Sequence, residues 1–328
     1  MNIAVFGWYH HRNAGDDRIQ ACLTRWLDGH TLAFLPAGRP APVGLLRTYD
    51  AAIIGGGGLL MNEGGIFRRM AGWVRSAGIP VALVGVSVER LTPGLRSELR
   101  EFLDVCCFAW FRDQGSLDEV GAHPRAFVAP DVTWLYPLPV SPPRSDAVAL
   151  ALARPVRVPT AAWRDVMARL GKPVLPWPLH FEGGGDGKVL SEVLPGAVVP
   201  SEFTLEPLLQ SDVAVSARYH GLLFAIQTGR PFVAVGGLPK TRRFLTDVGL
   251  GEWTIDESEP GALPDRLRHL ERVGEAHSLR LLSLRDELRA ETEKASRVAL
   301  DKLLEAASSL PRPSRRWRTR LRSAIERW

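Results

Sequence analysis

The chain is poor in the residues that cross-link small proteins or bind metal ions. Its 328 residues include only three cysteines, Cys22, Cys106 and Cys107. Their number and spacing exclude a disulfide framework and a CxxC metal site, and they favour a reducing compartment. The chain also lacks an HExxH sequence and clustered carboxylates of the metal-binding type. We therefore expect neither a catalytic nor a structural metal.

Long hydrophobic runs are missing as well. No stretch approaches the ~20 consecutive apolar residues that a membrane-spanning helix requires. The N-terminal sequence MNIAVFGWYHH has no basic segment, and its apolar run is too short for a signal peptide. With 45% hydrophobic and 23% charged residues, the composition is typical of a soluble globular protein. We expect a cytoplasmic protein, and the length predicts two domains of roughly 150 residues.

Excess positive charge is confined to the C-terminus. The formal net charge is +5, but residues 311–328 hold seven of the 41 Lys and Arg and one of the 36 acidic residues. The rest of the chain has 34 basic and 35 acidic residues, so we expect no nucleic-acid partner. In the tail, one helical face would carry apolar residues, with arginines on the others, namely Trp317, Leu321, Ala324, Ile325 and Trp328. This pattern fits a basic amphipathic helix at an anionic membrane surface, or else a disordered basic tail.

Apolar strands and amphipathic helices alternate along the chain, which predicts parallel sheets with helices on both faces. The expected strands cover residues 2–9, 49–60 (which enters a glycine loop at Gly55–Gly58), 79–88, 107–113, 147–152, 172–180, 213–220 and 231–237. The expected helices cover 18–27, 67–78, 93–106, 160–171, 201–212, 221–229 and much of 260–308. The proline-rich segment 137–146 is the expected linker. The fold class is therefore α/β, with two doubly wound Rossmann-like domains, 1–140 and 146–308, that face a cleft and bind ligands near the strand ends.

The stretch SARYHGLLFAIQTGRP, residues 216–231, places Arg218 and His220 at the end of an expected strand, on one face because strand side chains alternate. A helix is expected to begin at Gly221, with N–H groups and a positive dipole end that favour anions. Lys240 follows the next strand and would open onto the same cleft. Arg binds carboxylate or phosphate through two hydrogen bonds, and His transfers protons near neutral pH. The pattern predicts an anion site, although an R-x-H sequence alone is also compatible with a buried His beside a surface Arg.

Two glycine-containing loops supply further candidates. In GWYHHRNAGDD, Asn13 and Asp16 either cap the next helix or hydrogen-bond a hydroxylated ligand, and His10 and His11 are ambiguous in the same way. The loop expected at Gly55–Gly58 matches neither a dinucleotide nor a phosphate fingerprint. It predicts close approach of the backbone to a ligand, or close packing between the domains.

Two other polar segments can be explained by local structure as well as by function. His180 precedes a glycine loop with Glu182 and Asp186, which is either a source of a general base or an ordinary surface loop. The sequence FRDQGSLDEVG has Asp113 three residues before Ser116, a spacing that a helix cap explains.

Five segments in order, GWYHHRNAGDD, IIGGGGLL, FRDQGSLDEVGA…PDVTWL, PLHFEGGGD and SARYHGLLFAIQTGRPFVAV…PK, resemble the polysaccharide pyruvyl transferase family up to about residue 250. The resemblance implies a fold of the GT-B kind. It implies phosphoenolpyruvate as co-substrate, with no other cofactor, and formation of a pyruvate ketal on a sugar diol with release of phosphate. The implied acceptor is a saccharide of a bacterial surface polysaccharide or exopolysaccharide, or its lipid-linked precursor. The first loop departs from the family pattern at His10, His11 and Arg12. This departure concerns the preference for an acceptor more than the reaction itself.

The family's R-x-H and P-K motifs map onto Arg218, His220 and Lys240. Our hypothesis makes His220 the general acid and His180 a candidate base, and lets Arg218, Lys240 and the Gly221 N–H bind phosphoenolpyruvate. The residues expected to bind the acceptor are Asn13, Asp16, His10, Gly57 and Gly58. A lipid-linked acceptor would explain contact of the tail with the inner face of the cell membrane.

Two alternatives stay open. One is a GT-B glycosyltransferase that uses a nucleotide sugar, although no acidic residue for the donor's hydroxyls lies between Ala217 and Gly229. The other is a non-catalytic scaffold for polysaccharide assembly.

Overall fold

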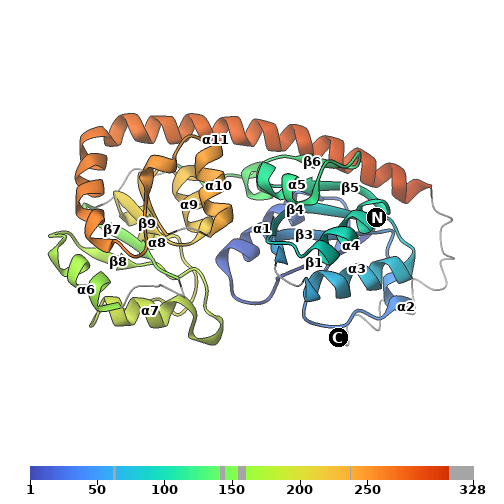
Figure 1. Cartoon of the computed structure of the whole chain (residues 1–328), viewed down its shortest axis with the longest axis horizontal. Helices are drawn as coiled ribbons and strands as arrows, with labels where there is room; N and C mark the ends of the chain where they lie inside the picture. Colours follow the sequence, from blue (N-terminus) through green and yellow to red (C-terminus); the bar gives the residue numbers. More distant parts are fainter. Residues whose placement is uncertain (62–63, 141–144, 154–159, 237, 310–328) are drawn as a thin grey trace. The chain divides into compact units, whose positions relative to one another are not determined.

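The computed structural model describes residues 1–61, 64–140, 145–153, 160–236 and 238–309. They form two compact units, each built on one parallel sheet (Figure 1). The first unit comprises residues 1–10, 18–135 and 290–309, and the second comprises 11–17 and 136–289. The domains expected from the sequence are continuous, whereas these units exchange two segments. The tail at 311–328, with its amphipathic pattern, lies outside the described residues.

The first unit contains a sheet of six strands in the order β2-β1-β3-β4-β5-β6. The strands are β1 Asn2–Gly7, β2 Thr31–Pro36, β3 Ala51–Met61, β4 Val81–Glu89, β5 Cys106–Phe111 and β6 Ala126–Val128. The helices are α1 Ala14–Trp26, α2 Val43–Leu46, α3 Gly65–Ala77, α4 Pro93–Leu103 and α5 Gln114–Val120, with a 3-10 turn at Val132–Leu135. Every residue of β4 is buried, as expected for a central parallel strand covered on both faces.

The second unit contains five strands in the order β11-β10-β9-β7-β8. They are β7 Val148–Ala151, β8 Val174–Pro176, β9 Val213–Ser216, β10 Phe232–Val235 and β11 Thr254–Ile255. The helices are α6 Thr160–Arg169, α7 Gly185–Val193, α8 Glu206–Gln210, α9 Tyr219–Gln227, α10 Pro239–Asp247 and α11 Leu263–Ser308, with 3-10 turns at Glu182–Gly184, Gly251–Trp253 and Pro260–Ala262. The predicted fold class, two parallel sheets with alternating helices, is confirmed.

Two features of the first sheet differ from the prediction. Strand β2 was not expected, because its apolar run, Leu32–Leu35, is short, and its residues are exposed or only partly buried. The glycines Gly55–Gly58 were expected to form a loop, but they lie inside β3. At Gly56 (φ 79°), a Cβ atom would lie 2.4 Å from Cγ2 of Ile19 in α1. This glycine therefore lets α1 pack closely on the strand within one unit.

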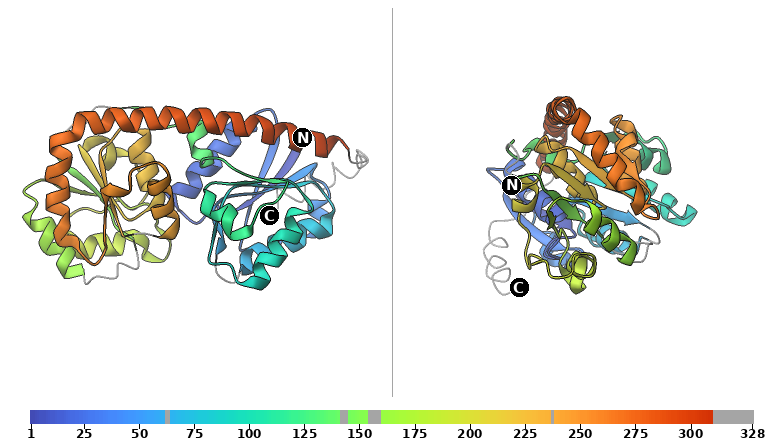
Figure 2. Two further views of the ribbon diagram at one scale, coloured as in Figure 1. Left: turned by 45° about the horizontal axis from the view of Figure 1, so that its top comes forward. Right: turned by 90° about the vertical axis from the view of Figure 1, so that its left-hand side faces the viewer.

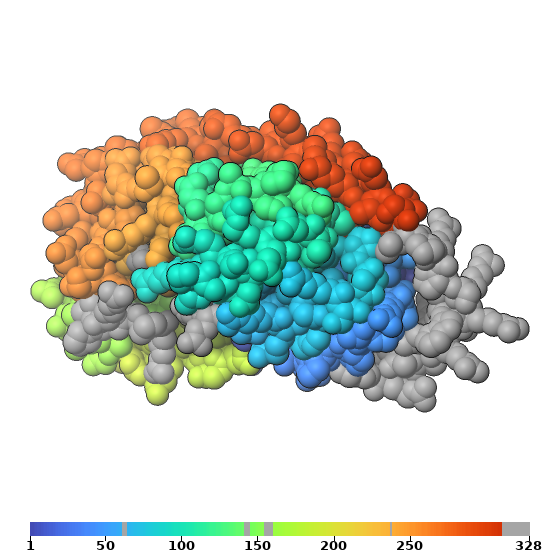
Figure 3. All heavy atoms as spheres, turned by 45° about the vertical axis from the view of Figure 1, so that its right-hand side comes forward, coloured from blue at the N-terminus to red at the C-terminus, as the bar shows by residue number. Residues whose placement is uncertain are grey.

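Helix α11 runs as one continuous ribbon from orange to red (Figure 2). Its residues up to Arg289 belong to the second unit, and those from Ala290 belong to the first. The red end of the helix packs on the blue and cyan part of the first unit (Figure 3), where Ala306 borders a cavity of about 580 Å³ together with Val74 and Val81. None of the helices that the structure describes is both long and apolar enough to cross a bilayer.

His277 of α11 makes the stability of the second unit depend on pH. Its side chain is buried, with ring centroids 4.5 Å from Trp253. Burial, and secondly the charge of nearby Arg280, lower the pKa of His277 from 6.5 to about 4. Because the folded pKa lies below the unfolded one, the stability is fully present above pH 6.5 and falls as the pH falls towards 4.

We expect His277 to account for a loss of about 3 kcal/mol in the free energy of unfolding over this pH range. Urea unfolding of wild type and His277→Leu at neutral and acidic pH measures it, because only the His277 part of the loss disappears in the variant. His269→Leu, at an exposed position of the same helix, is the matched control. An equal acid loss in wild type and His277→Leu would contradict the prediction.

Candidate functional site

The carboxyl end of β9 carries Arg218 and His220, but neither lies on the strand. The strand ends at Ser216, Arg218 is the N-cap residue of α9, and His220 lies in the first turn of that helix. Ser216 Oγ accepts a hydrogen bond from Arg218 N (3.1 Å) and donates one to Arg218 O (3.0 Å), which closes the turn. The expectation that the two side chains share a strand face was therefore wrong.

Gly221 also differs from its predicted position. Helix α9 begins at Tyr219, so Gly221 lies within its first turn and not at its start. A Cβ atom on Gly221 would lie 2.3 Å from Ser216 Oγ, so only glycine lets the helix pack against the end of β9. The first-turn N–H groups have no partners within the helix, and they carry its positive dipole end.

Arg218 forms an ion pair with Asp186, which was expected in a flexible loop. Asp186 lies instead in the first turn of α7 and is fully buried. Arg218 Nε donates to both Asp186 oxygens at 3.1 Å, and Nη2 donates to Oδ1. The Arg218 side chain is 25% exposed, so part of the guanidinium faces solvent.

His180 lies beside this pair at the end of the segment that follows β8. Its backbone N donates to Asp186 Oδ2 (3.1 Å), and its carbonyl accepts from Asp186 N (2.8 Å). A Cβ atom on Gly185 (φ 36°) would lie 1.9 Å from the His180 carbonyl oxygen, so this closed turn requires glycine. Burial, and secondly the charge of Arg218, lower the pKa of the His180 imidazole. It is therefore neutral near pH 7 and able to accept a proton.

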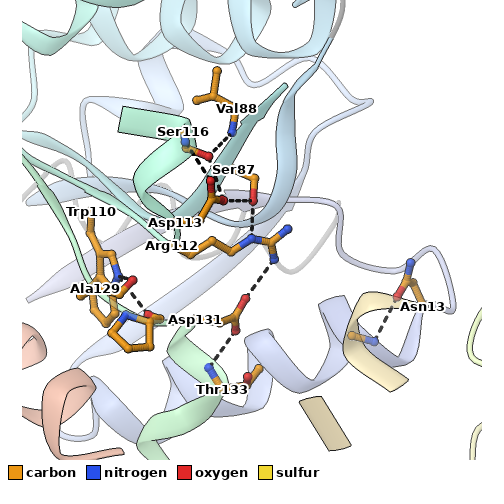
Figure 4. A network of polar contacts seen from close by, with 12 residues as sticks. Asn13, Ser87, Val88, Trp110, Arg112, Asp113, Ser116, Ala129, Asp131 and Thr133 are labelled. Atoms are coloured by element: carbon orange, nitrogen blue, oxygen red, sulfur yellow. Dashed lines mark hydrogen bonds and ion pairs between the residues drawn. The ribbon is translucent and has the colours of Figure 1, made fainter. Parts of the chain in front are cut away.

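The loop at 11–17 belongs to the same unit and packs between the two histidines. Ala14 N donates to Leu179 O (2.8 Å), and Asn13 pairs with His180 in an isolated β-bridge. Asn13 Oδ1 accepts from Gly15 N (3.0 Å; Figure 4). A Cβ atom on Gly15 would lie 1.9 Å from His220 Nδ1, so the backbone at Gly15 lies directly against the imidazole.

The other predicted site residues take different positions. Lys240 lies in the first turn of α10, which follows β10, and β10 pairs with β9 in parallel. Arg218 and Lys240 therefore follow the same edge of the sheet. Asp16 is buried in the first turn of α1. The remaining three, His10, Gly57 and Gly58, belong to the first unit and are not part of the cluster described here.

A second polar cluster, in the first unit, was only partly foreseen (Figure 4). Arg112 Nη1 donates to Asp131 Oδ2 at 2.9 Å, and both side chains are almost fully buried. Arg112 Nε donates to Ser87 Oγ. The expected cap is confirmed, because Asp113 Oδ1 accepts from Ser116 N at 2.8 Å. Asp131 was missed, and the polar residue between Pro130 and an apolar run was its one signal in the sequence.

Among the residues that the structure describes, no group of three or more His, Cys, Asp or Glu side chains is arranged to hold a metal ion. The cluster of the second unit instead combines a guanidinium, two imidazoles and a helix N-terminus. Such groups bind anions and transfer protons.

Solved structures similar to this chain show the class of its fold. UDP-GlcNAc 2-epimerase from Neisseria meningitidis, bound to UDP-GlcNAc, matches with a TM-score of 0.57 and 11% identity over 93% of this chain and 100% of that one. A putative UDP-N-acetylglucosamine 2-epimerase from Listeria monocytogenes has a TM-score of 0.61 and 10% identity, covering 95% and 98%. The calicheamicin glycosyltransferase CalG4 has a TM-score of 0.54 and 13% identity, covering 93% and 99%. The fold is that of the GT-B glycosyltransferases and related epimerases.

Sequence comparison identifies the family. No curated protein matches the chain significantly. The model of the polysaccharide pyruvyl transferase family matches residues 6–186, more than half of the chain. That match includes the loop at 11–17, His180 and Asp186, and it stops before Arg218. The chain belongs to the polysaccharide pyruvyl transferase family.

Proposed function

We propose that this protein transfers the pyruvyl group of phosphoenolpyruvate to two hydroxyls of one sugar, forming a ketal and releasing phosphate. The observation that carries the proposal is the cluster of the second unit, where Arg218 and His220 lie at the N-terminus of α9 and His180 contacts the first turn of α7. Family membership supports a transferase that acts on a polysaccharide or its precursor. The acceptor belongs to a bacterial surface polysaccharide or exopolysaccharide, or to its lipid-linked precursor.

The donor binds at the edge of the sheet where β9 and β10 end. Phosphoenolpyruvate carries a phosphate and a carboxylate on adjacent atoms, so its recognition needs several converging donors. Arg218 and the first-turn N–H groups of α9, including that of Gly221, supply hydrogen bonds to these oxygens. Lys240, at the start of α10, adds a second positive charge from the neighbouring strand end.

His220 acts as the acid that starts the reaction. Its proton goes to the methylene carbon of phosphoenolpyruvate, which becomes a methyl group and leaves C2 electrophilic. One sugar hydroxyl adds to C2, and the second displaces phosphate by forming the other C–O bond. Of the two hydroxyl protons, one returns to His220, and the other is taken up by His180 and passed to the leaving phosphate.

The neutral imidazole of His180 is the candidate base for a sugar hydroxyl. Its lowered pKa keeps it unprotonated near pH 7, as a base requires. Asn13 is bridged to His180 through the backbone. Its amide and the buried Asp16 are the candidates for hydrogen bonds to the acceptor.

A thermal-shift titration tests the donor assignment. At 100 times its dissociation constant, a ligand stabilises the folded state by about 2.7 kcal/mol. We expect phosphoenolpyruvate to raise the melting temperature of wild type, and UDP- and GDP-sugars to have no effect. A shift with nucleotide sugars alone would contradict the proposal and indicate a GT-B glycosyltransferase. Binding of phosphoenolpyruvate without ketal formation on any saccharide would instead indicate a scaffold.

We propose in addition that residues 311–328 bind the inner face of the cell membrane, where a lipid-linked acceptor lies. The support comes from the sequence alone, namely seven arginines among recurring Trp, Leu and Ile residues. Each Arg contributes roughly 1 kcal/mol at an anionic surface. We expect the full chain to sediment with phosphatidylglycerol vesicles but not with phosphatidylcholine vesicles, and a chain ending at Ser309 to sediment with neither. Equal sedimentation of both chains would contradict the proposal.

A further inference from the structure

Asp186 is the polar residue that connects the candidate groups of the second unit. It is fully buried, yet it contacts both Arg218 and the backbone of His180. Its Oδ2 accepts from Leu179 N (3.0 Å), from His180 N (3.1 Å) and from Arg218 Nε (3.1 Å). Its own backbone N donates to His180 O (2.8 Å). The Asp186 carboxylate therefore binds both the Arg218 guanidinium and the main chain of His180.

The carboxylate has almost no capacity left for a substrate or a proton. Two carboxylate oxygens offer about four acceptor positions. The backbone N–H groups and the guanidinium of Arg218 occupy them. The carboxylate lies in the first turn of α7 and forms an ion pair with Arg218. Asp186 is thus suited to orient other groups and unsuited to general base catalysis.

The ion pair also fixes which edge of Arg218 faces a ligand. Asp186 engages Nε and Nη2, and among the described residues Nη1 has no hydrogen bond. The side chain is 25% exposed, so its outer donors meet solvent. A buried partner on one side thereby leaves a single oriented edge for an anion.

We propose that Asp186 is a positioning residue that aligns the Arg218 guanidinium with His180 for the transfer reaction. This inference rests on the proposed function, because it names the residue that organises the same site. Asp186 touches no reacting atom and acts through Arg218. A loosened guanidinium displaces the bound anion by an ångström or more, a misplacement that costs on the order of 10²-fold in rate.

The test is a double-mutant cycle on ketal formation. Asp186→Asn keeps the size of the side chain but removes the charge and places an amide N–H group against other donors. We expect it to lower kcat/KM for phosphoenolpyruvate on the order of 10²-fold in wild type and less than about twofold in Arg218→Met. An equal loss in both backgrounds would show a structural role independent of Arg218 and overturn the proposal. Full activity of Asp186→Asn would overturn it too.

Glu182→Gln provides the matched control. It makes the same change from carboxylate to amide four residues earlier, at an exposed side chain that pairs with His11. We expect kcat/KM to stay within about twofold of wild type in this variant, since an exposed ion pair contributes little.

A second measurement does not require activity. In wild type labelled with ¹⁵N-arginine, the Arg218 Nε–H, assigned by its loss in Arg218→Lys, should exchange slowly with solvent. In Asp186→Asn its exchange should be at least about tenfold faster, whether or not the variant is active. Rapid exchange in wild type would overturn the positioning role. Slow exchange in a wild type that binds no phosphoenolpyruvate would preserve the Asp186–Arg218 pair and reject the proposed function.

Discussion

His220→Ala should lower kcat for ketal formation by about 10²–10⁴-fold while phosphoenolpyruvate still stabilises the protein. The imidazole lies at the N-terminus of α9, and the backbone at Gly15 lies directly against it. In the proposed reaction the imidazole donates a proton to the methylene carbon. The backbone N–H groups of the first helical turn cannot act as an acid in its place. The same proposal assigns anion binding to Arg218, Lys240 and the N–H groups of α9, which the variant retains.

Coupled detection of released phosphate measures kcat, and a thermal-shift titration measures donor binding in the same preparations. His220→Gln is the second variant, because it keeps a polar side chain of similar size but cannot donate a proton as an acid. His269→Ala, at an exposed position in α11, controls for the loss of a histidine as such. If His220→Gln kept more than a fifth or so of wild-type kcat, another group would have to be the acid.

The second large effect concerns the stability of the first unit. Arg112→Met should lower the free energy of unfolding by about 3–5 kcal/mol, because it removes the charge of Arg112 from the buried Asp131 carboxylate. The two side chains are 2% and 0% exposed, and their atoms Nη1 and Oδ2 are 2.9 Å apart. The hydroxyl of Ser87 and the backbone N of Thr133 complete the cluster and depend on the same pair.

Urea unfolding followed by tryptophan fluorescence measures this loss. Arg68→Met is the matched control, since Arg68 pairs with Glu98 in the same unit but both side chains are 44% exposed. That variant should lose less than about 1 kcal/mol. Replacing Arg112 and Asp131 together by apolar residues should recover much of the stability. If Arg112→Met were no less stable than Arg68→Met, the buried pair would not support the fold.

Much of the fold could be predicted because a buried strand appears in the sequence as a short run of consecutive apolar residues. The central strands β3 and β4 are continuous apolar runs, and the expected end of a helix at Gly78 is confirmed by its left-handed φ of 66°. Strand β2 escaped prediction, since it is a partly buried edge strand whose apolar run, Leu32–Leu35, is short. The start of α9 was misjudged for another reason. The Ser216 hydroxyl accepts a hydrogen bond from Arg218 N and so forms a turn, and hydrophobic periodicity gives no sign of such a side-chain bond.

The sequence by itself determined the α/β class, the family, and the placement of Arg218, His220 and Lys240 near the ends of successive strands. These properties follow from short-range patterns of burial and from which residues end each strand. Only the tertiary structure decided that Arg218 pairs with Asp186, 32 residues away, and that residues 11–17 join the second unit. Such pairings depend on which loops the sheet order brings to one edge, and on glycines such as Gly15 that allow backbone to approach a side chain. No local pattern in the chain carries that information.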